Sequence, residues 1–200
     1  ENAGGPVRLV DGDGDSVNTG VSANIIGPVA DMDKDGTPEV TAVDSNNDLI
    51  LIPAVSGATK EVLVTDATKK DPASRTISIG DIDDDGAVSV LYSQQSSLEI
   101  WKYEVGGDDG KALVSDVKSK GIVGYGAFDG DADDEIVYRG DSGQIKWVDA
   151  GVNSPDGDTG TSNYGSNNGI GLGPLTDYDS DGTNRVSAAS GSNVPSLIDD

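Results

Sequence analysis

Short runs of apolar residues alternate with polar ones along the chain, and turns rich in Gly, Asn, Ser and Asp separate them. Apolar residues at every second position predict β-strands, because alternate side chains of a strand face the same side. No helical period flanks the turns. The pattern therefore predicts an all-β protein in which a strand, a polar turn and a second strand recur. These pairs cover residues 39–44 and 49–52, 88–92 and 98–103, 135–139 and 144–148, and 185–189 and 194–198.

An acidic loop precedes each pair of strands. Its fullest copy reads Asp31-Met32-Asp33-Lys34-Asp35-Gly36-Thr37-Pro38-Glu39. Altered copies begin at Asp81, Ala127 and Asp177, so successive copies are 50, 46 and 50 residues apart. A repeat of this length is typical of propellers and solenoids, in which each repeat contributes one small unit of the core.

The first copy has the residues of a calcium-binding loop. Carboxylates stand at positions 1, 3, 5 and 9, and a Gly at position 6 allows a sharp bend. Calcium prefers such hard oxygen ligands, and the backbone carbonyl at position 7 adds another. The predicted ligands are Asp31, Asp33, Asp35, the carbonyl of Thr37, and Glu39. The alternative is a solvated turn, since Asp and Gly favour turns in any acidic protein.

An EF-hand also begins with alternating Asp residues and a Gly, but it has a bidentate Glu at position 12. The four copies have Ala42, Tyr92, Tyr138 and Ala188 at that position. The EF-hand interpretation therefore fails in every copy.

The second and fourth copies lack the carboxylate at position 9. The second offers Asp81, Asp83, Asp85 and the carbonyl of Ala87, with the weaker ligand Ser89 at position 9. The fourth offers Asp177, Asp179, Asp181 and the carbonyl of Thr183, followed by Arg185. A guanidinium cannot bind calcium, but it can neutralise the acidic cluster in place of an ion.

The third copy keeps the carboxylate at position 9 and loses the first one. Its candidate ligands are Asp129, Asp131, Asp133 and Glu135. A register two residues later would place the three Asp residues at positions 1, 3 and 5 but Val137 at position 9, so the first register is preferred. We therefore expect one to four calcium ions, with the loop from Asp31 to Glu39 as the strongest site.

The outer strands predict how the repeats are arranged. Residues 62–66 and 112–116 form a fourth strand in two repeats, and the N-terminal residues 7–11 have the same shape. The last repeat ends at its third strand, so we expect the N-terminal strand to complete it. The result is one domain, residues 1–200, forming a small β-propeller of four blades of about 48 residues, with no long unpaired edge. The predicted blades are 24–67, 76–117, 121–168, and 170–198 plus strand 7–11.

Small residues occupy the strand that enters each loop: Gly27-Pro28, Ile79-Gly80, Gly124-Tyr125-Gly126 and Gly171-Leu172-Gly173-Pro174. A strand with Gly, then Asp-x-Asp-x-Asp-Gly-x-x-Glu, then a hydrophobic strand resembles the FG-GAP/VCBS repeat of integrin alpha-subunit propellers. The resemblance covers about residues 20–198. It implies a β-propeller with calcium in the loops between first and second strands, and an extracellular binding or adhesive role. Because integrin-like propellers have seven blades, the alternative is a slice of a larger seven-bladed ring.

Charge narrows the possible partners. The chain has 36 acidic and 13 basic residues, a formal charge of -23 and a pI near 4.1. Nucleic acid and anionic membranes would repel it, and no apolar run is long enough to enter a membrane. An acidic surface with few Lys resembles that of proteins from salt-loving organisms, in which salt screens self-repulsion. The alternative is an acidic secreted protein. The first residue is Glu1, and we expect a processed or excised part of a surface protein.

The functional expectation follows from the absence of catalytic residues and from the calcium loops. There is no His, the commonest general base. Loops of modest charge fill at the millimolar calcium found outside cells, so we expect an extracellular or cell-surface location. We predict a non-enzymatic binding or adhesion module that recognises a glycan or a surface protein. Candidate sugar-stacking residues are Tyr103, Tyr125, Tyr164 and Tyr178, and the commoner alternative is that such residues are half-buried strand positions.

Two other functions remain open. The protein is a structural subunit of an extracellular filament if copies self-associate by stacking or by exchanging the N-terminal strand. It is an enzyme of the polysaccharide-lyase type if a Lys or Arg near calcium serves as the base. The few basic residues show no cleft pattern, which disfavours the enzyme.

Overall fold

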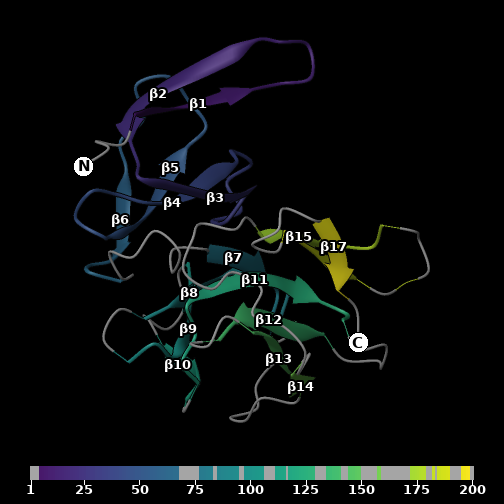
Figure 1. Ribbon diagram of the computed structural model, residues 1–200. Coiled ribbons are helices and arrows are strands. Elements are labelled where there is room, and N and C mark those ends of the chain that lie inside the picture. The colour runs from purple at the N-terminus through teal and green to yellow at the C-terminus, as the bar shows by residue number, and fades with distance from the viewer. Residues whose placement is uncertain are drawn as a thin grey trace.

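The computed structural model describes residues 5–67, 77–82, 85–94, 97–105, 111–115, 117–128, 134–140, 144–149, 157–158, 172–178, 182, 184–189 and 195–198. Within these residues every regular element is a β-strand, and the strands form five antiparallel sheets (Figure 1). The all-β prediction is confirmed. The same residues contain no helix that could cross a membrane.

Four of the sheets correspond to the four predicted repeats. In each, consecutive strands pair with one another in chain order, as predicted. The first sheet contains β3 (Ile25–Ala30), β4 (Glu39–Val43), β5 (Leu49–Pro53) and β6 (Glu61–Val64). The second contains β7 (Ile77–Gly80), β8 (Ser89–Ser93), β9 (Ile100–Glu104) and β10 (Lys111–Val114). The third contains β11 (Gly121–Gly126), β12 (Glu135–Arg139), β13 (Ile145–Asp149) and the short β14 (Gly157–Asp158). The fourth contains β15 (Leu172–Thr176), β16 (Arg185–Ala189) and β17 (Pro195–Ile198).

The sheets stack face to face, which is why their second strands are so apolar. Every residue of β4, β8 and β12 is buried. Leu51 and Tyr92 share the apolar layer between the first and second sheets. Ile136 lies in the next layer, and Val186 in the layer between the third and fourth sheets. The core is therefore a series of thin layers, and no sheet has a core of its own.

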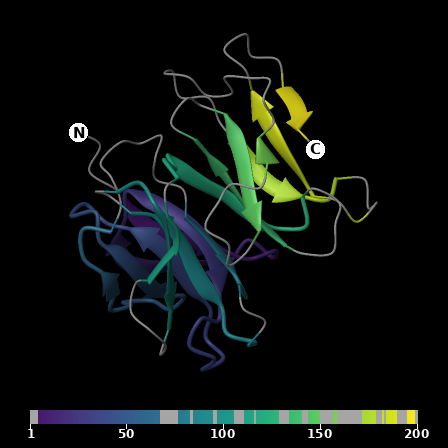
Figure 2. The ribbon, with the colours of Figure 1, turned by 90° about the horizontal axis from the view of Figure 1, so that it is seen from below.

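Glycines let consecutive first strands approach one another. β3, β7, β11 and β15 lie side by side in this order, so that the sheets follow one another in an arc (Figures 1 and 2). A Cβ added to Gly27 would lie 2.4 Å from the side chain of Ile77. The same construction at Gly80 meets Tyr125 at 2.4 Å, and at Gly124 it meets Leu175 at 2.5 Å. Each glycine thus leaves space for a larger side chain of the next sheet, as expected for glycine where strands crowd.

The predicted role of the N-terminal strand is wrong. β1 (Pro6–Val10) pairs with β2 (Ser16–Ser22), a strand that was not predicted, and forms a separate two-stranded sheet. Among the described residues β17 pairs only with β16, so the fourth sheet has three strands and the strands form no closed ring.

The hairpin forms because its strands are close in sequence and carry a matching apolar face. Val7 is 2% exposed and packs with Ala23, Val40, Ala42, Ile50 and Ile52 on the outer face of the first sheet. Pairing across a short turn costs less chain entropy than pairing with the far end of the chain. Residues 11–15 form that turn, and Asp11 Oδ1 accepts hydrogen bonds from the backbone N–H groups of Asp13 and Asp15.

Candidate metal centre

Strand pairing brings the carboxylates of the first acidic loop together. Asp31 follows the last residue of β3, and Glu39 is the first residue of β4. Ala30 and Glu39 are partners in the ladder, so the loop begins and ends at one place. One carboxylate oxygen from each of Asp31, Asp33 and Glu39 lies within 4.8 Å of the others. The two strands therefore position three of the predicted ligands.

Backbone hydrogen bonds fix the shape of the loop. Asp31 Oδ2 accepts from Gly36 N–H at 3.0 Å, Asp33 Oδ1 from Asp35 N–H at 3.0 Å, and Asp35 Oδ1 from Thr37 N–H at 2.7 Å. Gly36 has a φ of 90°, a left-handed conformation that glycine adopts without strain. One oxygen of each Asp thus holds the backbone of the loop, and Asp35 is not one of the three carboxylates that converge.

The loop is also anchored in the core. Met32 is 3% exposed and lies in the layer between the first two sheets. Its backbone N–H donates to Glu39 Oε2 at 2.8 Å, and Glu39 is 4% exposed. The corresponding residues Ile82 and Phe128 are buried in the second and third copies, whereas Tyr178 of the fourth is 45% exposed. This anchor was not predicted, although an apolar residue at position 2 of every copy is its visible signal.

The charge of the loop is unfavourable without a cation. Burial raises the pKa of Glu39, and the negative charges of Asp33, Asp35 and Asp31 raise it further, while the hydrogen bond from Met32 lowers it. A raised pKa means that the ionised carboxylate is less favourable in the folded protein than in water. A bound cation would reverse this effect, because it favours the ionised form.

The second loop repeats the backbone geometry and leaves two buried oxygens. Asp81 Oδ2 accepts from Gly86 N–H at 2.9 Å, and Asp85 Oδ1 accepts from Ala87 N–H at 2.7 Å. Asp81 Oδ1 and Ser89 Oγ are buried and have no hydrogen-bond partner among the residues that the structure describes. Buried polar atoms normally have a partner, so a cation or a water molecule fits this position. Asp83 lies outside the described residues.

The third and fourth loops keep parts of the arrangement. Glu135 Oε2 accepts from Phe128 N–H at 2.6 Å, which aligns Glu135 with Glu39. Asp177 Oδ2 accepts from Gly182 N–H at 3.0 Å, as in the first two loops. Arg185 begins β16 at the position where Glu39 begins β4. The other candidate ligands of these loops, Asp129, Asp131, Asp133, Asp179, Asp181 and Thr183, lie outside the described residues.

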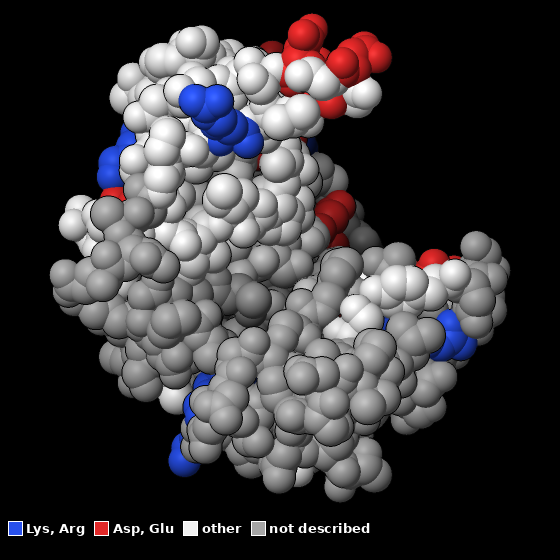
Figure 3. Space-filling view, turned by 45° about the horizontal axis from the view of Figure 1, so that its top comes forward, with Lys and Arg blue, Asp and Glu red and all other residues white. Residues whose placement is uncertain are grey.

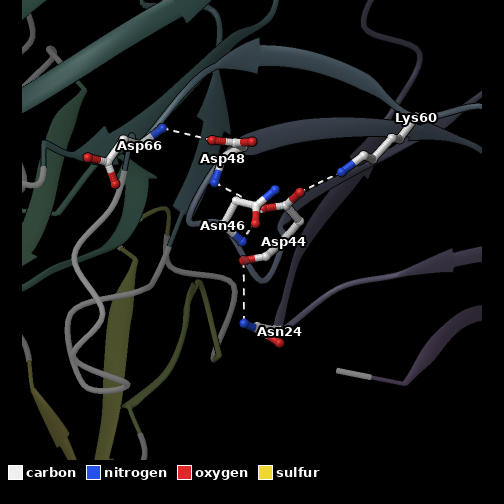
Figure 4. A network of polar contacts seen from close by, with 6 residues as sticks. All are labelled: Asn24, Asp44, Asn46, Asp48, Lys60 and Asp66. Atoms are coloured by element: carbon white, nitrogen blue, oxygen red, sulfur yellow. Dashed lines mark hydrogen bonds and ion pairs between the residues drawn. The ribbon is translucent and has the colours of Figure 1, made fainter. Parts of the chain in front are cut away.

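A second polar cluster lies at the opposite end of the β4–β5 hairpin (Figure 4). Asp44 is 3% exposed and accepts hydrogen bonds from Lys60 Nζ at 2.5 Å, Asn46 N–H at 2.7 Å and Asp48 N–H at 3.1 Å. Burial alone would raise the pKa of Asp44, but these donors outweigh it and hold the pKa below 3.8. The cluster fixes the turn between the strands. Nothing in the sequence indicates that Lys60 reaches Asp44.

Two of the four candidate sugar-stacking tyrosines pack against neighbouring strands. Tyr103 is 9% exposed and belongs to the core. Tyr125 packs against Gly80, and its hydroxyl donates to the carbonyl of Asp81 at 3.1 Å. Tyr103 is therefore a buried strand position and Tyr125 a partly buried one, which agrees with the alternative interpretation of these two residues. Tyr178 is exposed, and Tyr164 lies outside the described residues.

Comparison with known proteins adds no relative. No family model matches the sequence, and no curated protein matches it.

Proposed function

We propose that this protein is an extracellular binding module, built as a β-propeller or an arc of one and stabilised by calcium, that recognises a glycan or another protein at a cell surface. The observation that carries the proposal is the convergence of Asp31, Asp33 and Glu39 within 4.8 Å at the start of the first sheet.

The chemistry of this cluster favours calcium. Its candidate ligands are all oxygens, which suit a hard cation. Calcium holds its ligands at about 2.3–2.6 Å, so two ligands on opposite sides of one ion are about 5 Å apart. The three carboxylate oxygens lie within 4.8 Å of one another, which is compatible with that range. The backbone hydrogen bonds of Asp31 and Asp35 reduce the ordering that binding requires.

The stacked sheets favour propeller blades. In each sheet strands pair in chain order, and the first strands of consecutive sheets are neighbours. In a propeller the first strand of each blade lines the axis, where space is smallest. The glycines that admit Ile77, Tyr125 and Leu175 stand on these first strands.

Calcium has a structural role in this proposal. The loop joins the first and second strands of its sheet, so an ion there fixes the hairpin that begins the sheet. Binding to the folded state alone stabilises it by about 2.7 kcal/mol when free calcium is 100-fold above the dissociation constant. Weak sites of this kind fill outside cells, where calcium is millimolar, which supports the extracellular location.

The test is thermal unfolding of chelator-treated protein in high salt, with calcium or magnesium then titrated in. We expect a rise in Tm of several degrees that saturates with calcium and is smaller with magnesium. Asp31→Asn should abolish most of the rise. Asp13→Asn, an equal change of charge in the β1–β2 turn, should leave it unchanged. No calcium-dependent shift in the unaltered protein would overturn the calcium part of the proposal.

Recognition is tested separately on a glycan array and on cell-surface extracts, in calcium and in chelator. We expect binding that chelator abolishes. Calcium-dependent turnover of a polysaccharide instead of binding would replace this proposal with the enzymatic function.

A further inference from the structure

The first strand of the first sheet, β3, has exposed apolar side chains on one face. Ile26 and Val29 of β3 are 60% and 48% exposed. They pair with Ala42 and Val40, and paired residues of a ladder face the same side. The β1–β2 hairpin covers Ala42 and Val40. The hairpin therefore covers the outer part of this face and leaves an apolar strip on β3.

In the third and fourth sheets the corresponding strip is covered by the preceding sheet. Val29 stands two residues before the first position of its loop, as Tyr125 and Leu175 do in theirs. Tyr125 packs against Gly80 of the preceding first strand, and Leu175 packs against Gly124. Among the described residues no preceding four-stranded sheet covers Val29, and the β1–β2 hairpin covers only the outer part of the face. β3 therefore has space for one more first strand.

The fourth sheet, at the opposite end of the arc, has fewer strands than the first. In the part of the chain that the structure describes, the fourth sheet has three strands and β17 pairs with β16 alone. The first strand of this sheet, β15, contains Gly173 four residues before Asp177, where its loop begins. In the same way β3 contains Gly27 four residues before Asp31. Gly27 receives Ile77 of the next sheet. By position, β15 can receive a further first strand in the same way.

Within the residues that the structure describes, β1 and β17 do not pair with one another. Figures 1 and 2 place β1 and β17 far apart, and Figure 3 shows a hollow in one side of the molecule. β1 has the sequence shape of a fourth strand, since Val7-Arg8-Leu9-Val10-Asp11 parallels Val62-Leu63-Val64-Thr65-Asp66. Outside its pairing with β2, β1 has no strand partner among the described residues.

We propose that a second copy of this chain fills the hollow, with its β15–β17 sheet against Ile26 and Val29 and its β17 along β1. The contact continues the packing that joins the sheets within the chain, and the added strand completes the fourth sheet by β-augmentation. It joins two different surfaces, so copies associate head to tail, either closing as a ring of two or extending as a filament. The inference rests on the propeller-like stacking in the proposed function and does not depend on calcium.

Charge sets the conditions for association. Each copy carries a formal charge of -23, and Asp11, Asp13 and Asp15 are all exposed at the tip of the hairpin. Like charges on two copies repel over distances that salt shortens. Association should therefore strengthen as salt is raised to about 1 M, where the screening length is about 3 Å.

The test is the mass in solution, measured by light scattering and sedimentation over a range of protein and salt concentrations. We expect the unaltered chain to exceed its single-copy mass of 20.4 kDa in high salt. Val29→Asp should weaken association by about tenfold or more, because it places a charge in an apolar contact. Val62→Asp is the matched control: Val62 is 43% exposed on β6 of the same sheet, and its change should leave association intact. Both variants should keep the unfolding free energy of the unaltered chain.

Cysteine cross-linking shows which surfaces meet, because the chain has no Cys of its own. A mixture of Val10→Cys and Ser196→Cys single variants should form a disulfide between two different copies. A single-copy mass under all conditions, or association that Val29→Asp leaves unchanged, would overturn the proposal. A double variant that cross-links only within one copy would also overturn it, in favour of a ring closed by one chain. In each case the calcium-dependent rise in Tm of the proposed function would be unaffected.

Discussion

The carboxylate of Glu39 and the backbone N–H of Met32 are joined by a buried hydrogen bond of 2.8 Å across the first acidic loop. Met32 lies in the core, and Glu39 begins β4 beside two Asp carboxylates. Glu39 therefore both holds the loop on the core and contributes to the candidate ion site. Its effect on stability should depend on whether the ion is present.

Replacing Glu39 by Gln should have opposite effects with and without calcium. The amide keeps an oxygen that accepts the Met32 N–H but removes the charge. In chelator the variant should be the more stable protein at neutral pH, because it no longer ionises a buried carboxylate whose pKa is raised. In calcium it should be the less stable one, with calcium affinity lowered by about tenfold or more. Chemical unfolding in both conditions measures the reversal.

The pH dependence gives an independent check of the same variant. A carboxylate with a raised folded-state pKa binds more protons when folded, so its unfavourable contribution grows as pH rises above the ordinary value of 4.5. The advantage of Glu39→Gln in chelator should therefore disappear as pH falls below that value. An advantage that persists at low pH would show that charge is not its cause.

Replacing Ser89 by Glu should strengthen the second loop. Ser89 Oγ and Asp81 Oδ1 are buried without hydrogen-bond partners among the described residues, and Glu39 occupies the corresponding position in the first loop. The longer carboxylate supplies the missing ligand. Isothermal titration should show tighter calcium binding or one more bound ion. Ser16→Glu, an equal charge change at an exposed position of β2, should not alter the titration.

Replacing Gly80 by Ala should separate the second and third sheets. The new Cβ would stand 2.4 Å from the ring of Tyr125, whose hydroxyl is tied to the carbonyl of Asp81. The ring cannot move aside without losing that hydrogen bond, so we expect a loss of about 1–3 kcal/mol in unfolding free energy. Urea unfolding measures the loss. Gly12→Ala, which has nothing within 4 Å of the new Cβ, should cost far less.

Replacing Lys60 by Met should weaken the β4–β5 turn. The change keeps the aliphatic stem and removes the ammonium group from the buried carboxylate of Asp44. Because the Lys side chain is 37% exposed, solvent screens the pair and the expected loss is about 1 kcal/mol at neutral pH. Lys118→Met, a loss of the same charge at an exposed site, is the control and should be nearly neutral.

Acid should remove the difference between the unaltered chain and Lys60→Met. The pKa of Asp44 is lowered by folding, so its favourable contribution is present above 3.8 and is lost as pH falls through the folded-state pKa. Unfolding curves between neutral pH and strongly acidic conditions check this. A difference that stays constant would assign the effect of Lys60 to packing.

Local pattern predicted the strands well because the alternation of apolar residues is itself what the sheets bury. β4 and β5 fall where the pattern places them, and so do their counterparts in later repeats. The N-terminal strand was misplaced because residues 7–11 fit any outer strand equally well. The nearest available partner strand decides the pairing. Val17, Thr19 and Val21 also alternate with their neighbours in sequence, and they form β2 only a short turn away from β1.

The acidic loops show the same division between local and distant information. The spacing of Asp31, Asp33 and Glu39 anticipated that their carboxylates converge, because a loop between paired strands must return to its start. The contact between Lys60 and Asp44 could not be predicted, since it depends on how β6 lies beside β5. The packing of Tyr103 and Tyr125 likewise follows from the neighbouring sheets, which no single repeat specifies.

The side chains that fill the three glycine positions differ in size and shape: Ile77, Tyr125 and Leu175. Each junction between sheets is thus matched to its own pair of repeats, although all four repeats share one strand order. A chain with two repeats exchanged would keep every strand and every acidic loop, yet a Tyr would face a space made for an Ile. The order of the repeats along the chain is therefore part of the folding information, and the four units are related without being interchangeable.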